Sequence, residues 1–361
     1  MKARLLVLFL ALALVSAVAS SAHAKKSPKT VYQQTNLVSD QSGSTTTDDN
    51  LKNAWGIAFF PGAPFWIADN GSGVATLYDG AGTSQPQPTP LVVNLPTPSS
   101  NTGAAATGLV ANTTMSFVIP ANSAPAQFIF ATEDGTLLGW NTTLSDTTQA
   151  VIVADNSSGG AVYKGVAIGS NSSGNFLYAT DFSKGTVDVF DSTFHAATLS
   201  GNFEDPNLPK RYAPFGIANI SGDLYITFAK QDKAKKDELH GQGMGIVDIF
   251  DTDGNFLQRF VSHGRLNAPW GITQASASFG DFSNDILIGN FGNGKINAYD
   301  PVSFKFQGFL AGAKHKALKI DGLWGLTFGG AMNSSTDVLY FTAGPNKEAN
   351  GLFGSIAPAA Q

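Results

Sequence analysis

Residues that could carry chemistry recur along this 361-residue chain at a nearly constant spacing. Six repeated glycines, 51 to 57 residues apart, each follow a residue at which a pocket could form: Trp55, Thr107, Lys164, Phe215, Trp270 and Trp324. In four of the repeats a carboxylate or amide follows the next apolar run: Asp69, Glu133 (with Asp134), Asp181 and Asn290. Aromatic walls around a few convergent polar groups suit a pocket for a small molecule or a glycan.

Lys164 is the one charged residue among the six that precede a repeated glycine. Placed among Asp69, Glu133 and Asp181, its ammonium would be held by opposite charge and could orient an anionic or polar ligand. Alternatively, Lys164 is a counter-ion that relieves carboxylate repulsion, while the aromatic side chains plug a channel and the Asp and Asn side chains cap turns. The sequence leaves both interpretations open.

The acidic residues also raise the question of a metal. Hard cations take six to eight oxygen ligands, and the repeats contain no dense acidic cluster. We therefore expect no cofactor, and keep as an alternative a Ca²⁺ site formed by Asp69, Glu133, Asp181 and Asn290. Cysteine is absent, the histidines after residue 24 lack zinc-ligand spacing, and no G-x-S-x-G motif occurs. No decisive catalytic set is present.

The elements that must position these residues are short strands. Around each glycine lies an apolar run, a second run follows (for example 65–68 and 224–227), a third often ends in Asp (74–79, 186–191, 246–251), and most repeats add a weaker fourth. Runs of this length, rich in β-branched and aromatic residues and bounded by Gly, Asn, Asp or Ser, indicate strands. Six such repeats predict an all-β, six-bladed β-propeller with four-stranded antiparallel blades.

The predicted propeller spans residues 25–361, with blades that start near residues 52, 104, 161, 212, 267 and 321. The sixth repeat has no fourth run, and the segment 31–38 has no repeat of its own. We therefore expect this segment to be the outer strand of the last blade. Closure of this kind removes an unpaired sheet edge.

The first 24 residues have the features of a signal peptide. Lys2 and Arg4 precede an apolar stretch, and Ala22-His23-Ala24 is an A-x-A cleavage signal. We expect a secreted or periplasmic protein without a stable membrane anchor; an uncleaved N-terminal anchor is the alternative. The formal charge of −5 argues against a nucleic-acid partner. We expect a monomer whose partner is a small molecule, a glycan or a protein.

The phrases Pro214-Phe215-Gly216-Ile217 and Pro269-Trp270-Gly271-Ile272, with a Gly-x-Val-x-Val-Phe-Asp phrase at 185–191, resemble NHL-repeat propellers. The segment 32–40, followed by 53–57, is similar to a family of secreted bacterial propellers, some of which end in a PEP-CTERM sorting tail. This chain ends in Ile-Ala-Pro-Ala-Ala-Gln, without that tail. The resemblance implies the propeller fold and no established reaction.

Two functions follow as expectations. The first is an exported propeller that binds a ligand or partner, or serves as a scaffold, at the cell envelope or exterior. The alternative is a divalent-metal-dependent hydrolase, lactonase or lyase with its site at the channel mouth. The charged run 230–240 falls between the second and third strands of the fourth repeat, so it should lie on the same face as the pocket, as a lid, a partner contact or a solvated loop.

Overall fold

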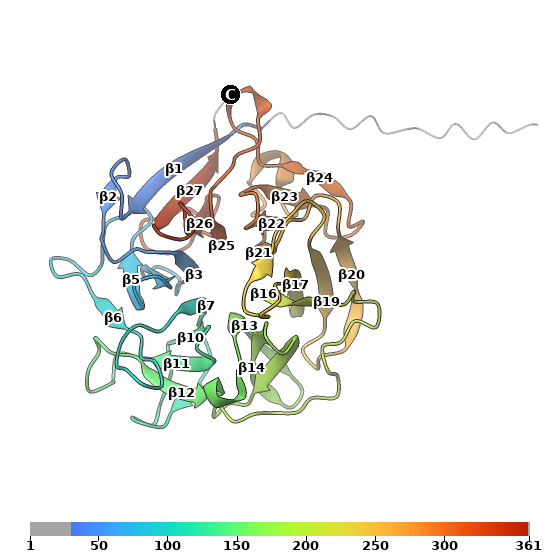
Figure 1. Ribbon diagram of the computed structural model, residues 1–361. Helices are drawn as coiled ribbons and strands as arrows, with labels where there is room; N and C mark the ends of the chain where they lie inside the picture. The colour runs from blue at the N-terminus through green and yellow to red at the C-terminus, as the bar shows by residue number, and fades with distance from the viewer. Residues whose placement is uncertain (1–29, 360–361) are drawn as a thin grey trace, which may run out of the picture.

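The computed structural model describes residues 30–359, so the predicted signal peptide lies outside the described residues. Six sheets surround a central axis as the blades of a propeller, which confirms the predicted fold class (Figure 1). Among residues 30–359, no helix combines the length and apolarity needed to cross a membrane.

The first three blades follow each other around the ring, each with its first strand innermost. Blade 1 contains β3 (Ala54–Ala58), β4 (Phe65–Asp69), β5 (Val74–Tyr78) and β6 (Val92–Asn94). Blade 2 contains β7 (Ala106–Ala111), β10 (Phe128–Thr132), β11 (Thr136–Trp140) and β12 (Val151–Asp155), with a small hairpin of β8 (Val118–Ile119) and β9 (Ala124–Pro125). Blade 3 contains β13 (Tyr163–Asn171), β14 (Gly174–Asp181) and β15 (Thr186–Phe190).

The remaining blades complete the ring. Blade 4 contains β16 (Tyr212–Ile220), β17 (Asp223–Gln231), β18 (Glu238–Leu239), β19 (Ile246–Phe250) and β20 (Phe256–Ser262). Blade 5 contains β21 (Pro269–Gln274), β22 (Ile286–Asn290), β23 (Ile296–Tyr299) and β24 (Phe306–Phe309). Blade 6 contains β25 (Leu323–Phe328), β26 (Leu339–Ala343), β27 (Leu352–Pro358), β1 (Tyr32–Ser39) and β2 (Thr46–Thr47). Three short 3₁₀ turns are η1 (Ser157–Gly159), η2 (Gly280–Phe282) and η3 (Ala313–His315).

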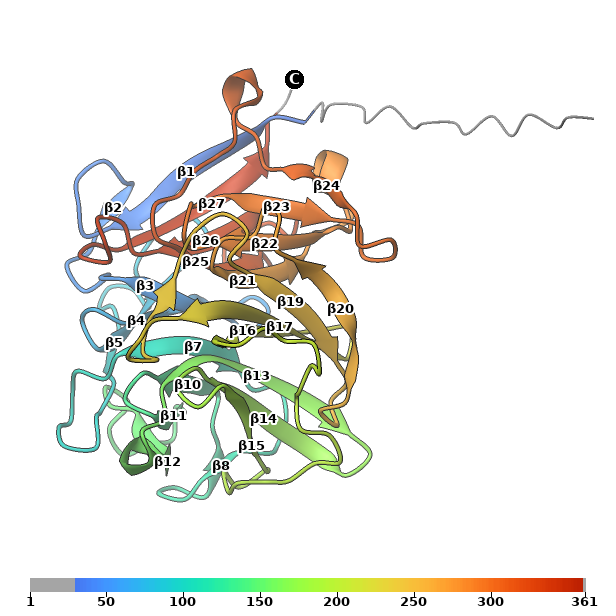
Figure 2. The ribbon, with the colours of Figure 1, turned by 45° about the vertical axis from the view of Figure 1, so that its right-hand side comes forward.

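Blade 6 closes the ring as the sequence predicted. Strand β1 runs antiparallel to β27, from Tyr32 opposite Pro358 to Ser39 opposite Leu352. The two strands lie side by side in both views (Figures 1 and 2). Tyr32 and Val38 are buried, so β1 contributes apolar packing as well as hydrogen bonds. The N-terminal strand therefore supplies the outer part of the last blade.

The repeated glycines allow neighbouring inner strands to approach each other closely. A Cβ atom on Gly271 would lie 2.3 Å from the carbonyl oxygen of Trp324, and one on Gly216 would lie 2.2 Å from the carbonyl oxygen of Trp270. Real Cβ atoms do not occur at such distances, so larger residues would push the blades apart. Each repeat supplies one such glycine to its inner strand, which explains why the glycines recur every 51 to 57 residues in the sequence.

Threonine hydroxyls also tie neighbouring blades together near the axis. Thr180 on β14 donates to the carbonyl oxygen of Phe215 at 2.8 Å, and Thr107 on β7 donates to that of Tyr163 at 2.8 Å. These hydroxyls are buried and bond backbone groups of the next blade, so they satisfy carbonyl oxygens that the close approach would otherwise leave without partners.

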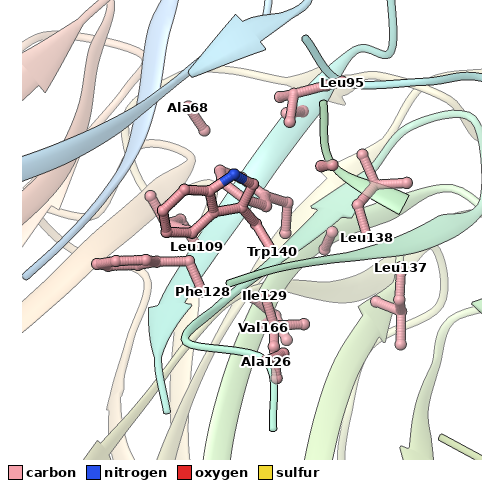
Figure 3. Close-up of a cluster of buried hydrophobic side chains, with 14 of the residues drawn as sticks. Ala68, Leu95, Leu109, Ala126, Phe128, Ile129, Leu137, Leu138, Trp140 and Val166 are labelled. Carbon is pink, nitrogen blue, oxygen red and sulfur yellow. The ribbon is translucent and has the colours of Figure 1, made fainter. Parts of the chain in front are cut away.

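Apolar side chains fill the spaces between blades. The largest cluster joins blades 1, 2 and 3 and includes Leu109, Phe128, Trp140 and Val166 (Figure 3). The ring of Trp66 stacks on Phe128 with centroids 4.3 Å apart. These apolar and aromatic contacts join neighbouring blades through buried surface.

Blade 3 differs from the predicted four-stranded pattern, because three strands form its sheet. After β15 the chain turns and makes one bridge, between Phe190 and Ala196. It then leaves for blade 4, where the amides of Gly201 and Phe203 donate to the carbonyl oxygens of Asp253 and Gly254. These contacts draw the segment away before a fourth strand can form.

Candidate functional site

An aromatic cluster closes the central axis. Trp55, Phe215, Trp270 and Trp324, which precede repeated glycines, pack together with Phe182. Trp55 and Trp324 stack with ring centroids 3.6 Å apart, and Trp324 stacks in turn on Phe291 at 4.0 Å. The aromatic side chains thus plug the channel, as one interpretation of the sequence expected.

Lys164 lies at the edge of this plug and is almost fully buried. Its Nζ forms an ion pair with Glu133, lies 3.6 Å from Asp237 Oδ1, and sits 5.2 Å from the ring centroid of Trp55. Its carbonyl oxygen accepts a hydrogen bond from Trp270 Nε1 at 2.8 Å. Lys164 therefore connects the acidic residues at the mouth to the aromatic plug.

Two asparagines orient the carboxylates around Lys164. Asn70 Nδ2 donates to Glu133 Oε2 at 3.0 Å, and Asn53 Nδ2 donates to Glu348 Oε2 at 3.0 Å. Asn53 also accepts a hydrogen bond from Trp324 Nε1 at 2.9 Å through its Oδ1. Each carboxylate is thus held in place by a neutral donor that is itself anchored in the fold.

A cavity of about 660 Å³ opens at this end of the axis. Its wall combines aromatic rings with acidic side chains and few cations. The lining includes Trp55, Glu133, Lys164, Asp237, Glu238, His240, Phe291, Asp321, Trp324, Lys347 and Glu348. A concave space with an aromatic floor and a few charged groups has the character of a ligand pocket.

The electrostatics of the cavity are dominated by negative charge. Burial raises the pKa of Glu238 to about 7 despite the opposing effect of Lys164, and the neighbouring Glu348 and Asp237 raise it further. Burial and the charge of Glu133 also raise the pKa of Glu348. Burial acts to lower the pKa of Lys164, but Glu133 and Glu238 more than offset it, so the ammonium stays charged. The one buried ammonium, that of Lys164, thus interacts electrostatically with several carboxylates.

Asp69, Asp181 and Asn290 are fully buried and do not line this cavity. Asp69 accepts a hydrogen bond from Thr76 at 2.7 Å, and burial raises its pKa well above the usual value. Asp181 pairs with Lys184, whose Nζ lies 3.1 Å from Oδ2. These three side chains belong to the turns that follow the second strands, and of the predicted acidic residues Glu133 is the one beside Lys164.

The predicted residues that precede the repeated glycines do not all face the acidic cavity. Trp270 lines a second cavity of about 430 Å³ on the far side of the plug, between the inner strands. Phe215 is buried inside the cluster, and Thr107 is buried with its hydroxyl bonded to backbone. Trp55 and Trp324 are the two predicted aromatic residues that reach the acidic cavity.

The described residues do not fit a calcium site. Within residues 30–359, no three His, Cys, Asp or Glu side chains come close enough together to hold a metal ion. Asn290, the fourth residue of the alternative, uses its amide on the backbone of Asn267 and Lys295. The mouth offers a ligand charged groups, hydrogen-bond partners and aromatic faces.

The cavity also has lining residues outside the predicted set, among them Asp237, Glu238, His240, Phe291, Asp321, Lys347 and Glu348. Three of them belong to the charged run 230–240, which the sequence placed on this face. Glu348 lies in the loop between β26 and β27, the same class of loop that supplies Glu133 in blade 2. A search of the sixth repeat for a carboxylate after its second apolar run would have found it.

Fold and site together define a six-bladed β-propeller with an acidic pocket above a plugged channel. The chain belongs to the same family as two uncharacterized proteins of Acanthamoeba polyphaga mimivirus. One is 31% identical over 336 residues, covering 91% of this chain and 80% of the relative. The other is 30% identical over 317 residues, covering 86% and 81%. No family model matches the chain.

Solved structures share the fold at low sequence identity. Virginiamycin B lyase from Staphylococcus aureus superposes with a TM-score of 0.51 at 14% identity, covering 92% of this chain and all of the lyase. A putative gluconolactonase gives a TM-score of 0.51 at 13% identity, covering 91% and 92%. At these identities the likeness concerns the fold alone.

Proposed function

We propose that this propeller is a binding protein that takes a small molecule with a positively charged nitrogen into the acidic cavity. The observation that carries the proposal is the excess of carboxylates around Lys164: Glu133, Asp237, Glu238 and Glu348 share one buried ammonium. A second cation would relieve their mutual repulsion.

The walls of the cavity favour an organic cation over a simple ion. Phe291 is half-buried and extends the Trp55–Trp324 stack toward the cavity. Aromatic faces attract ammonium and guanidinium groups. Trp55 also lines the cavity, and its ring already faces the Lys164 ammonium. A ligand with a cationic nitrogen would in the same way complement the aromatic face of Phe291.

The protonation state of Glu238 should control how strongly this site binds a cation. With a pKa of about 7, Glu238 is partly protonated at neutral pH. An incoming cation favours its ionised form, so binding should release a proton. Affinity is therefore expected to rise with pH between about 6 and 8.

Thermal melting with matched probes tests the proposal. Putrescine and choline should raise the melting temperature of the full chain, whereas their neutral counterparts butane-1,4-diol and 3,3-dimethylbutan-1-ol should not. Glu238→Gln and Glu348→Gln should each reduce the shift. Asp49→Asn, at an exposed carboxylate outside the cavity, is the control. Equal shifts for charged and neutral probes would overturn the proposal.

We also propose that the protein is exported. The support is the sequence of residues 1–24, with its basic start, apolar stretch and A-x-A signal, and the similarity of segments 32–40 and 53–57 to secreted bacterial propellers. Expression in a bacterial host followed by N-terminal sequencing of the periplasmic fraction should give a chain that begins at Lys25. Recovery from the cytosol alone, with the leader intact, would contradict export.

A further inference from the structure

Blade 3 begins a fourth strand and does not complete it. In blade 4, the turn after β19 is closed by a hydrogen bond from the Asp251 amide to the Asn255 carbonyl, and β20 starts at the next residue. In blade 3, the Asp191 amide makes the same bond to the His195 carbonyl, and Ala196 bridges Phe190. Beyond Ala197 the segment leaves the sheet, so the rest of the fourth-strand position is not filled by a strand of residues 30–359.

The edge of β15 therefore carries unpaired backbone groups. Backbone groups of alternate residues point to opposite sides of a strand. Val189 faces away from β14, because its carbonyl oxygen accepts from the Ala197 amide. Val187 faces the same way by alternation, and in the described part of the chain its N–H and C=O have no backbone partner. The N–H of Val189 is likewise open.

The sequence of β15 resembles that of a strand which is paired on both edges and buried. Its residues Thr-Val-Asp-Val-Phe match Ile-Val-Asp-Ile-Phe of β19 position by position. All five residues of β19 are buried, whereas the first three residues of β15 are partly or fully exposed. A groove of about 370 Å³ runs beside this exposed part, between Val187 and Val189 and the departing segment 196–203.

Blade 4 also indicates which side chain the missing strand should carry. Asp248, at the third position of β19, lies opposite Arg259 of β20 and accepts a hydrogen bond from its Nε at 2.8 Å. Asp188 holds the same position in β15. Its carboxylate accepts from Tyr163 and Thr186 hydroxyls and has no basic partner within residues 30–359. A cationic side chain opposite Asp188 would complete the arrangement.

We propose that blade 3 binds an extended peptide segment of another protein as its fourth strand. The peptide runs antiparallel to β15, bonds the open groups of Val187 and Val189, and places an arginine or lysine opposite Asp188. Its apolar side chains enter the groove beside Val189. Strand addition of this kind obtains affinity from main-chain hydrogen bonds and specificity from alternate side chains.

The probe for the test is a fluorescein-labelled peptide with residues 258–262 of β20, Gln-Arg-Phe-Val-Ser. The first two residues of β20 are left out, because in blade 3 Ala196 already pairs with Phe190 where Phe256 pairs with Phe250 in blade 4. Fluorescence anisotropy with the full chain should show saturable binding below about 1 mM. Replacing the arginine of the peptide by glutamate should weaken binding at least tenfold. No binding up to that concentration would overturn the proposal.

Two changes test the backbone contact. Val187→Pro removes an N–H that makes no hydrogen bond within the sheet, so it should leave the melting temperature nearly unchanged and weaken binding at least tenfold. Val187→Thr keeps the N–H and the branched shape, and should bind as the unchanged chain does. Equal binding by the proline variant would contradict strand addition.

The peptide offers a version of the test that does not depend on the folding of a variant. N-methylation at the residue that corresponds to Val261, whose N–H faces the partner strand in blade 4, should abolish binding. N-methylation at the serine that follows, whose N–H points away because the next amide, that of His263, bonds Gly245 in blade 4, should not. Equal effects of the two modifications would overturn the proposal, as would self-association of the chain through this edge without peptide binding.

Discussion

The ammonium of Lys164 lies 5.2 Å from the ring centroid of Trp55, which in turn stacks on Trp324 at 3.6 Å. The same residue accepts a hydrogen bond from Trp270 through its carbonyl oxygen. Lys164 thus contacts the plug from blade 3 while its side chain faces carboxylates from blades 2 and 4. The charge balance of the pocket and the closure of the channel therefore depend on one residue.

Lys164→Met should destabilise the protein by about 2–3 kcal/mol at neutral pH, because Glu133 loses its buried partner and is itself only partly exposed. The loss should be smaller at pH 5, where Glu238, with a pKa of about 7, is protonated and adds no negative charge to the cavity. Lys347→Met, at an exposed lysine on the same cavity, should change stability by less than about 0.5 kcal/mol. Urea unfolding of the three proteins measures both values.

Gly271→Ala should destabilise the ring by about 3 kcal/mol or more, since the new methyl group would meet the Trp324 carbonyl oxygen. Gly159→Ala is the control, because a Cβ there meets only the end of the Lys184 side chain, at 3.7 Å. A melting temperature for Gly271→Ala equal to that of the control would contradict the close-approach explanation of the repeat.

Deletion of residues 25–40 should lower the melting temperature by about 10 °C or more, because blade 6 loses β1 and the buried Tyr32, Leu37 and Val38. A chain that starts at residue 30 keeps β1 and should melt close to the chain that starts at Lys25. Differential scanning calorimetry of the three chains provides the comparison. Equal melting of the longer deletion would refute closure by the N-terminal strand.

The pH dependence of stability follows from Glu238. Its pKa is raised from 4.5 in the unfolded chain to about 7 in the folded protein, so the folded state holds the proton more tightly. Stability from this group is present below about pH 4.5 and is lost as the pH rises toward 7. Between pH 5 and pH 8 the melting temperature should fall by about 2–4 °C more in the unchanged protein than in Glu238→Gln. Parallel profiles would contradict the assignment.

Much of the fold could be predicted because its signals are local. A repeated glycine such as Gly271 marks each inner strand, and the lack of a fourth run in the last repeat points to closure by the segment 31–38. Blade 3 could not be predicted in this way. Its fourth strand is prevented by contacts of Gly201 and Phe203 with the next blade, and such contacts between distant residues leave no periodic mark in the sequence.

The candidate site could be predicted only in part. The places of Lys164 and Glu133 in their repeats correctly suggested that the two lie together, but the same reasoning also grouped Asp69 and Asp181 with them. Asp69 and Asp181 follow the second strand of their repeats, as Glu133 does. Their carboxylates are nevertheless buried, where Asp69 accepts a hydrogen bond from Thr76 and Asp181 pairs with Lys184. Side-chain direction at a strand end depends on local hydrogen bonds that spacing alone does not reveal.

The central claim is that the acidic cavity binds an organic cation with release of a proton. Isothermal titration of the full chain with putrescine and with choline at pH 6.5, in buffers of different ionisation enthalpy, measures binding and proton release together. The account predicts saturable binding of at least one probe, release of a fraction of a proton near Glu238's pKa of about 7, and no release from Glu238→Gln. Absence of binding by both cations, or equally strong binding of butane-1,4-diol, would contradict it.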